Sequence, residues 1–127
     1  ALKQYQLAAG QYGYTAEVLS SIGSANLRLG RLGQAEDVLR RAVKEDDEFV
    51  PAWNNLGVVL MERNKVAEAA RVFRIAFSLD SGESVEIKEN LRLALEKLDE
   101  PAYDAPEESS FELVRESQGK YLLLSEP

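Results

Sequence analysis

Apolar side chains recur along this chain at steps of three and four residues, in several separate runs. In residues 18–29 the apolar positions are Val18, Leu19, Ile22, Ala25 and Leu29. The same spacing returns in residues 35–43, 52–61 and 66–77. Such steps place side chains on one face of a helix, so each run predicts an amphipathic α-helix. Strand-like alternation appears only after residue 110, so we expect an all-α fold.

Short polar or glycine-containing segments separate these runs and predict turns. The turns are expected at Gly30–Gly33, Asp46–Phe49, Arg63–Lys65 and Ser81–Gly82. Within the runs, small residues would let paired helices approach closely while large ones fill the space between them. The small positions are Gly23, Ala35, Gly57 and Ala69, and the large ones are Leu39, Trp53 and Phe73.

The runs are copies of one another at a spacing of 34 residues. One copy holds Trp53, Leu56, Gly57, Leu60, Ala69, Phe73 and Ala76, and the copy before it holds Leu19, Ile22, Gly23, Asn26, Ala35, Leu39 and Ala42. A further step back gives Ala1, Tyr5 and Ala8. In the other direction, Asn55 and Leu56 correspond to Asn90 and Leu91 at a spacing of 35. A fixed period of this length indicates stacked repeats.

The pattern W-x-x-L-G followed by A-x-x-x-F, from Trp53 to Phe73, resembles the tetratricopeptide repeat family, whose 34-residue unit is a helix–turn–helix. The resemblance covers residues 1 to about 99. It implies a short right-handed solenoid of helical hairpins. The chain departs from the family pattern at Leu60 and Asn26, where tyrosine is usual, at Leu19, where tryptophan is usual, and at Ser81, where proline is common.

The repeats divide the chain into segments. We assign residues 1–16 to the second helix of a truncated repeat, 17–49 and 50–83 to full repeats, and 84–99 to a capping helix. A single repeat cannot bury its apolar face alone. We therefore expect the first helix either to continue a longer chain or to be covered by another surface, including a second copy.

The residues after position 99 differ in composition. Residues 100–110 read as an acidic, proline-containing linker, and residues 111–127 as an apolar tail that is extended or forms a β-hairpin. An isolated hairpin is marginal in water. The tail is therefore either disordered or docked on its own repeats or a partner. The docking candidates are Phe111, Leu113, Tyr121 and Leu123.

The charge and the residue types narrow the function. The net charge is −7, and residues 100–127 contribute most of it, with seven Asp/Glu against two Lys/Arg. That balance argues against a nucleic-acid partner. The chain contains no histidine and no cysteine, which removes the commonest general base, thiol nucleophiles and most zinc ligands. We expect no enzyme activity, no cofactor and no metal. The acidic run Glu45–Glu48 reads as a helix-start feature rather than a calcium site, because it lacks the calcium-loop pattern.

What remains is a surface. The resemblance implies that the first helix of each repeat lines a concave groove that receives extended peptides. Projected onto this chain, the groove candidates are Arg28, Asn54, Asn55, Val58, Met61, Asn90 and Leu93. An asparagine amide can bond both the N–H and the C=O of a peptide backbone. We expect Asn55 and Asn90 to pair across repeats, and Asn54 to be the weaker candidate; the alternative for both Asn54 and Asn55 is simple solvent exposure. The family's carboxylate-binding pattern is not met, because Ser20 and Ser24 stand where lysine and asparagine are needed.

The sequence thus predicts a non-enzymatic protein-interaction scaffold that binds a peptide or partner subunit. Two alternatives stay open. The chain could be an oligomerisation or assembly module acting through its end helix and tail, as in a bacterial envelope, pilus or secretion assembly. It could also be a regulatory domain of a larger enzyme. No stretch of 18 apolar residues occurs, so we expect no membrane span. The compartment stays open between the cytoplasm and a bacterial periplasm, and the absence of cysteine slightly favours the latter.

Overall fold

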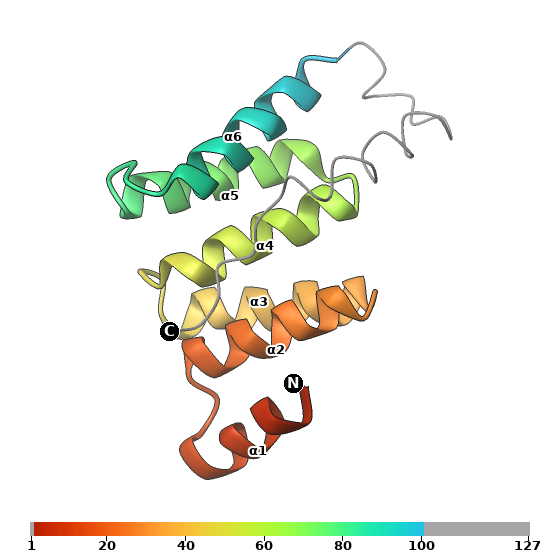
Figure 1. The fold of residues 1–127 in the computed structure, drawn as a ribbon, viewed down its shortest axis with the longest axis vertical. Coiled ribbons are helices and arrows are strands. Elements are labelled where there is room, and N and C mark those ends of the chain that lie inside the picture. Colours follow the sequence, from red (N-terminus) through yellow and green to blue (C-terminus); the bar gives the residue numbers. More distant parts are fainter. Residues whose placement is uncertain (1, 101–127) are drawn as a thin grey trace.

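The computed structural model describes residues 2–100, and in this range the chain is all helical, with six α-helices and no strand (Figure 1). The helices are α1 (Leu2–Tyr12), α2 (Ala16–Arg28), α3 (Leu32–Glu45), α4 (Val50–Glu62), α5 (Val66–Leu79) and α6 (Val85–Leu98). The all-α prediction is confirmed for this part of the chain. The predicted hairpin or extended tail at residues 111–127 lies outside the described residues.

The helices stack in two layers. Each helix packs against the next one in the chain, and α4 also packs against α2 and α6. In Figure 1, α2, α4 and α6 form one layer with α3 and α5 behind it, and α1 lies beside α2 at the N-terminal end. The helix α4 is therefore at the centre. Its residues from Asn54 to Met61 are all buried, which fits a helix with neighbours on several sides.

The helix ends follow from local sequence. Thr15 and Ser84 precede α2 and α6, and their hydroxyl oxygens accept hydrogen bonds from backbone N–H groups three residues on, both at 3.2 Å. The turns α2–α3 and α4–α5 are equivalent: Gly30 and Asn64, 34 positions apart, both have positive φ. After each, a backbone N–H bonds back into the finished helix, from Arg31 to the Asn26 carbonyl and from Lys65 to the Leu60 carbonyl. The four predicted turns fall between helices, except that α3 already begins at Leu32 and includes Gly33.

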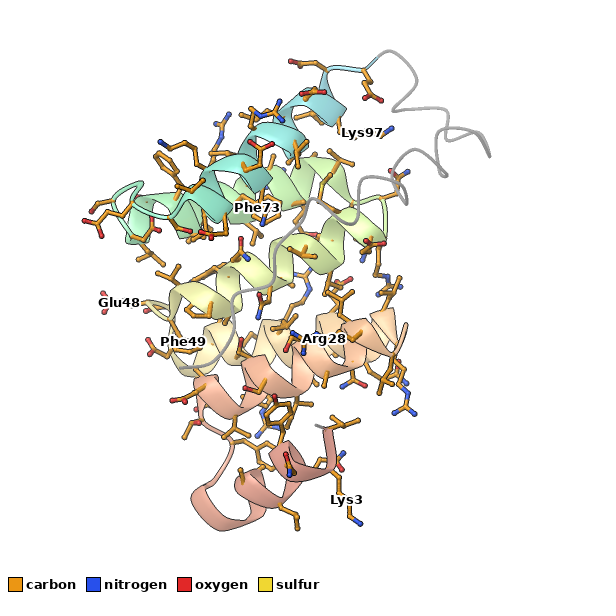
Figure 2. All side chains as sticks on the ribbon, viewed as in Figure 1. Lys3, Arg28, Glu48, Phe49, Phe73 and Lys97 are labelled. Atoms are coloured by element: carbon orange, nitrogen blue, oxygen red, sulfur yellow. The ribbon has the colours of Figure 1, made fainter. Side chains whose placement is uncertain are left out.

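Close approach of paired helices is set by two glycines, one in each full repeat. A Cβ placed on Gly57 would lie 2.4 Å from Cε1 of Phe73, and a Cβ on Gly23 would lie 2.4 Å from Cγ of Leu39. Both large residues are fully buried, and Figure 2 shows Phe73 within the stack. The 34-residue repeat therefore includes one small-against-large contact per helical pair, as the sequence predicts.

A buried carboxylate joins the two repeats. Glu36 of α3 is 5% exposed and accepts hydrogen bonds from Arg40 Nε at 2.9 Å, Arg63 Nη1 at 3.1 Å and Lys65 Nζ at 3.1 Å. Arg40 also bonds Glu68 of α5 at 2.8 Å. Burial alone would raise the pKa of Glu36, but the hydrogen bonds and charges of Arg40 and Lys65 outweigh it and lower the pKa below its usual value. The cluster is a structural contact between α3 and the turn before α5.

We predict that Gly57→Ala destabilises the fold by about 1–3 kcal/mol, because the added methyl group overlaps the Phe73 ring and forces the helices apart. Gly33→Ala is the matched control, since a Cβ there lies 3.9 Å from the nearest side-chain atom, of Arg63, and the position is inside α3. It should be neutral or slightly stabilising. Urea unfolding followed by circular dichroism measures both. Equal stability of the two variants would contradict the close-packing account.

We also predict a pH-dependent contribution from Glu36. Its pKa is lowered on folding, so the ionised group stabilises the fold above its unfolded pKa, and this contribution is lost as pH falls through the folded value. Glu36→Gln should lower the free energy of unfolding by about 1–2 kcal/mol at pH 7. The loss is smaller than for a fully buried ion pair, because the cationic partners of Glu36 are partly exposed to solvent. The difference in free energy of unfolding between wild type and Glu36→Gln should shrink as the pH falls from about 6 to about 3. Asp37→Asn, exposed and without an ion pair in residues 2–100, is the control. A gap that is constant with pH would refute this role.

Candidate functional site

The candidate groove residues lie on the layer formed by α2, α4 and α6. We call their shared surface the inner face. It comprises Ser20 of α2, then Asn54, Asn55, Val58 and Met61 of α4, and Asn90 and Leu93 of α6. On α4, Asn54, Val58 and Met61 follow steps of four and three, so they share one side of the helix. Trp53, Leu56 and Leu60 point to a different side, toward the core and the second layer.

Hydrogen bonds between amides and a hydroxyl group cross the inner face. Asn55 Nδ2 donates to Ser20 Oγ at 3.2 Å, which joins α4 to α2. Asn90 Nδ2 donates to Asn54 Oδ1 at 3.1 Å, which joins α6 to α4. Each bond runs from an asparagine to the previous repeat, so the three first helices are connected by polar side chains in one direction.

Asn55 and Asn90 are paired in the sequence by their position in successive repeats. The two residues do hold the same place in successive repeats, but each donates to the residue one position earlier in the preceding repeat. Both bonds are therefore offset by one position from the equivalent residue of the preceding repeat. Asn54 is therefore a direct partner in the row.

The solvent-exposure alternative for Asn54 and Asn55 is wrong. Asn54, Asn55 and Asn90 are all 0% exposed. Val58 and Met61 are buried with them and belong to the main apolar core. Leu93 is half-buried and Arg28 is exposed at the C-terminal end of α2. The inner face thus combines buried amides with an apolar floor, and Arg28 stands at its edge.

Carboxylates flank the part of the inner face that α6 contributes. Glu86 accepts a hydrogen bond from the Ser84 hydroxyl at 3.1 Å, and Glu89 and Glu96 form ion pairs with Arg92. On α2, Ser20 holds the position of Glu89, and Ser24 donates to the Ser21 carbonyl at 3.1 Å. This arrangement carries no cluster of cations that would hold a terminal carboxylate.

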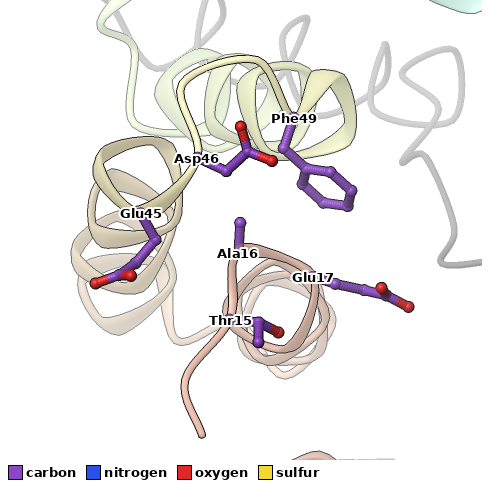
Figure 3. A pocket seen from close by; sticks show the side chains of 6 residues that line it. All are labelled: Thr15, Ala16, Glu17, Glu45, Asp46 and Phe49. Atoms are coloured by element: carbon purple, nitrogen blue, oxygen red, sulfur yellow. The ribbon is translucent and has the colours of Figure 1, made fainter.

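The acidic run between α3 and α4 borders a cavity of about 450 Å³ lined by Thr15, Ala16, Glu17, Glu45, Asp46 and Phe49. Figure 3 shows Asp46 and Phe49 facing Ala16, while the carboxylates of Glu17 and Glu45 point outward on different sides. Asp46 Oδ1 accepts from the Glu48 backbone N–H at 3.0 Å, which fixes the turn. The described residues contain no group of three acidic side chains placed to hold a metal ion.

The ion cluster around Glu36 is a feature that sequence reasoning missed. Its only local signal was the spacing of Glu36 and Arg40, one helical turn apart. Its other partners, Arg63 and Lys65, come from the next repeat. A buried carboxylate with a shifted pKa can mark a reactive site. Here three cations satisfy it, so it links elements instead.

Other predictions fall beyond the described part of the chain. The tail-docking candidates Phe111, Leu113, Tyr121 and Leu123 lie outside residues 2–100. At the other end, α1 exposes Leu7 at 66% while Ala9 is buried. Within the described residues no helix is long and apolar enough to cross a bilayer.

Comparison with known proteins agrees with this geometry. Residues 16–49, which span α2 and α3, match the tetratricopeptide repeat family. A 73-residue stretch is 37% identical to tetratricopeptide repeat protein 5 of Homo sapiens. That stretch is 57% of this chain and 17% of the human protein, so the chain spans a small part of its relative. The match, the 34-residue period and the stacked helical pairs support assignment of the described repeats to the tetratricopeptide repeat family.

Proposed function

We propose that this chain is a non-enzymatic protein-interaction module whose inner face binds an extended polypeptide segment. Tetratricopeptide repeats generally mediate interactions between proteins. The finer assignment, to this face and to an extended segment, is our proposal. It is supported by one observation above the others: amide side chains on α4 and α6 and the Ser20 hydroxyl on α2 form hydrogen bonds that link all three first helices.

This arrangement suits a peptide backbone for a physical reason. Asn54, Asn55 and Asn90 are held by bonds between repeats, so binding costs little further side-chain ordering. All three amides are 0% exposed in the unbound chain, so a peptide would reach them only after displacing the groups that cover them. Amide side chains can hydrogen-bond the backbone N–H and C=O groups of a peptide, with little preference for the sequence of that peptide. Val58, Met61 and Leu93 supply apolar contact for side chains that point toward the helices.

The tail is a second candidate occupant of this face. Phe111, Leu113, Tyr121 and Leu123 are apolar, and Val58 and Met61 provide the matching floor. We propose that the tail competes with a partner segment for the inner face. Substituting Phe111 and Tyr121 by serine in the full chain should then raise the affinity for a bound peptide about threefold or more, through loss of a tethered competitor.

The test of the main proposal is selection of binders from a random peptide library displayed on phage, using the full chain. Selected peptides should bind Asn55→Ala/Asn90→Ala protein about tenfold or more weakly, because two amide contacts at about 1 kcal/mol each are removed. Arg28→Glu, at the exposed edge, should change affinity for charged peptides without disturbing the core.

Arg74→Glu is the matched control, since Arg74 is exposed on α5 in the other layer. Thermal unfolding of every variant separates lost binding from lost folding. Peptides that bind the Asn55→Ala/Asn90→Ala and Arg28→Glu proteins at full strength would rule out the inner face.

A further inference from the structure

A second surface of the molecule has the features of a binding site. A pocket of about 350 Å³ opens between α3 and α5, within the size range of pockets that hold ligand groups. Its floor and walls include Trp53 and Leu56 of α4, Val72 and Ile75 of α5, and Val43 of α3. Trp53 and Leu56 project from a different side of α4 than Asn54, Val58 and Met61, so this pocket is separate from the inner face.

The aromatic wall of the pocket is fixed in place. Trp53 is the only tryptophan in the sequence, and its Nε1–H donates to the Asp47 carbonyl at 2.8 Å. The bond orients the indole, and Trp53 as a whole is half-buried. Ile75, at 39% exposed, forms part of the opposite wall. An apolar side chain entering between them would bury area against a rigid aromatic group at low entropic cost.

The rim of the pocket is positively charged. Arg40, Lys44 and Arg71 line it together with a single carboxylate, Glu68, which Arg40 already pairs with at 2.8 Å. Among residues 2–100, Lys44 and Arg71 are exposed and form no ion pair. The chain as a whole has a net charge of −7, so this positively charged rim has the opposite sign to the rest of the molecule taken together. Clustered cations at the mouth of an apolar pocket favour an anionic ligand with an apolar anchor.

We propose that this pocket docks an acidic peptide segment of a partner protein, with one bulky apolar side chain inserted beside Trp53. Carboxylates on either side of that anchor would then meet Lys44 and Arg71. The cations of the rim and the apolar floor match such a segment of another protein in both charge and hydrophobicity. This surface acts in addition to the inner face.

The test uses the full chain and the fluorescence of Trp53, which reports on the pocket directly. The probe is the synthetic peptide Asp-Glu-Glu-Phe-Glu-Glu-Asp, blocked at both ends. It should cause a saturable change in emission. Replacing its phenylalanine by serine, or using Lys44→Glu/Arg71→Glu protein, should weaken binding tenfold or more. Ile75→Ser should weaken binding without changing charge. Lys88→Glu, on α6 and exposed, is the matched control and should change binding less than twofold.

Each other outcome overturns the proposal. No saturable change in emission would mean that the pocket does not take such a segment. Equal binding by the Lys44→Glu/Arg71→Glu and Lys88→Glu proteins would show general electrostatic attraction instead. A tenfold gain in affinity when Glu107, Glu108 and Phe111 are replaced by Gln, Gln and Ser would assign the pocket to the chain's own acidic segment. None of these results depends on whether the inner face binds peptides.

Discussion

The packing of a glycine against a large side chain determines how close the helices of each repeat can come. Phe73 lies against Gly57 and Leu39 against Gly23, and no room for a Cβ exists at either glycine. This contact fixes the distance between the first and second helix of each pair. Once that distance is fixed, the remaining apolar faces can be buried only by stacking one pair on the next. The central helix α4, buried along Asn54–Met61, is the product of that stacking.

Stacking gives the two layers different chemistry. The first helices α2, α4 and α6 are linked by polar side chains, since Asn55 bonds Ser20 and Asn90 bonds Asn54. The second helices carry most of the basic side chains of the two full repeats. These are Arg40, Arg41, Lys44, Arg71 and Arg74. We propose that the first surface binds a peptide backbone and the second an acidic segment.

Sequence reasoning predicted most of the fold because the relevant signals are local or periodic. The turn positions, the glycine contacts and the shared repeat position of Asn55 and Asn90 all follow from counting residues. The partner of each asparagine did not follow, since both bonds are offset by one position from the equivalent residue of the preceding repeat. The Glu36 cluster was missed because Arg63 and Lys65 approach it from the next repeat. Burial of a polar residue between helices cannot be read from its own position, so Asn54 was undervalued.

Binding of a polypeptide segment across α2, α4 and α6 can be measured at single residues. Met61 is the only methionine in the sequence and lies on that face, whereas Trp53 is the only tryptophan and lines the other pocket. Labelling the methionine methyl group with ¹³C therefore gives one resonance for the inner face, and the Trp53 indole N–H gives one for the pocket. Addition of a peptide selected for binding should shift the Met61 methyl resonance to saturation and leave the Trp53 resonance in place. A Met61 resonance that does not move while the peptide binds would contradict the account.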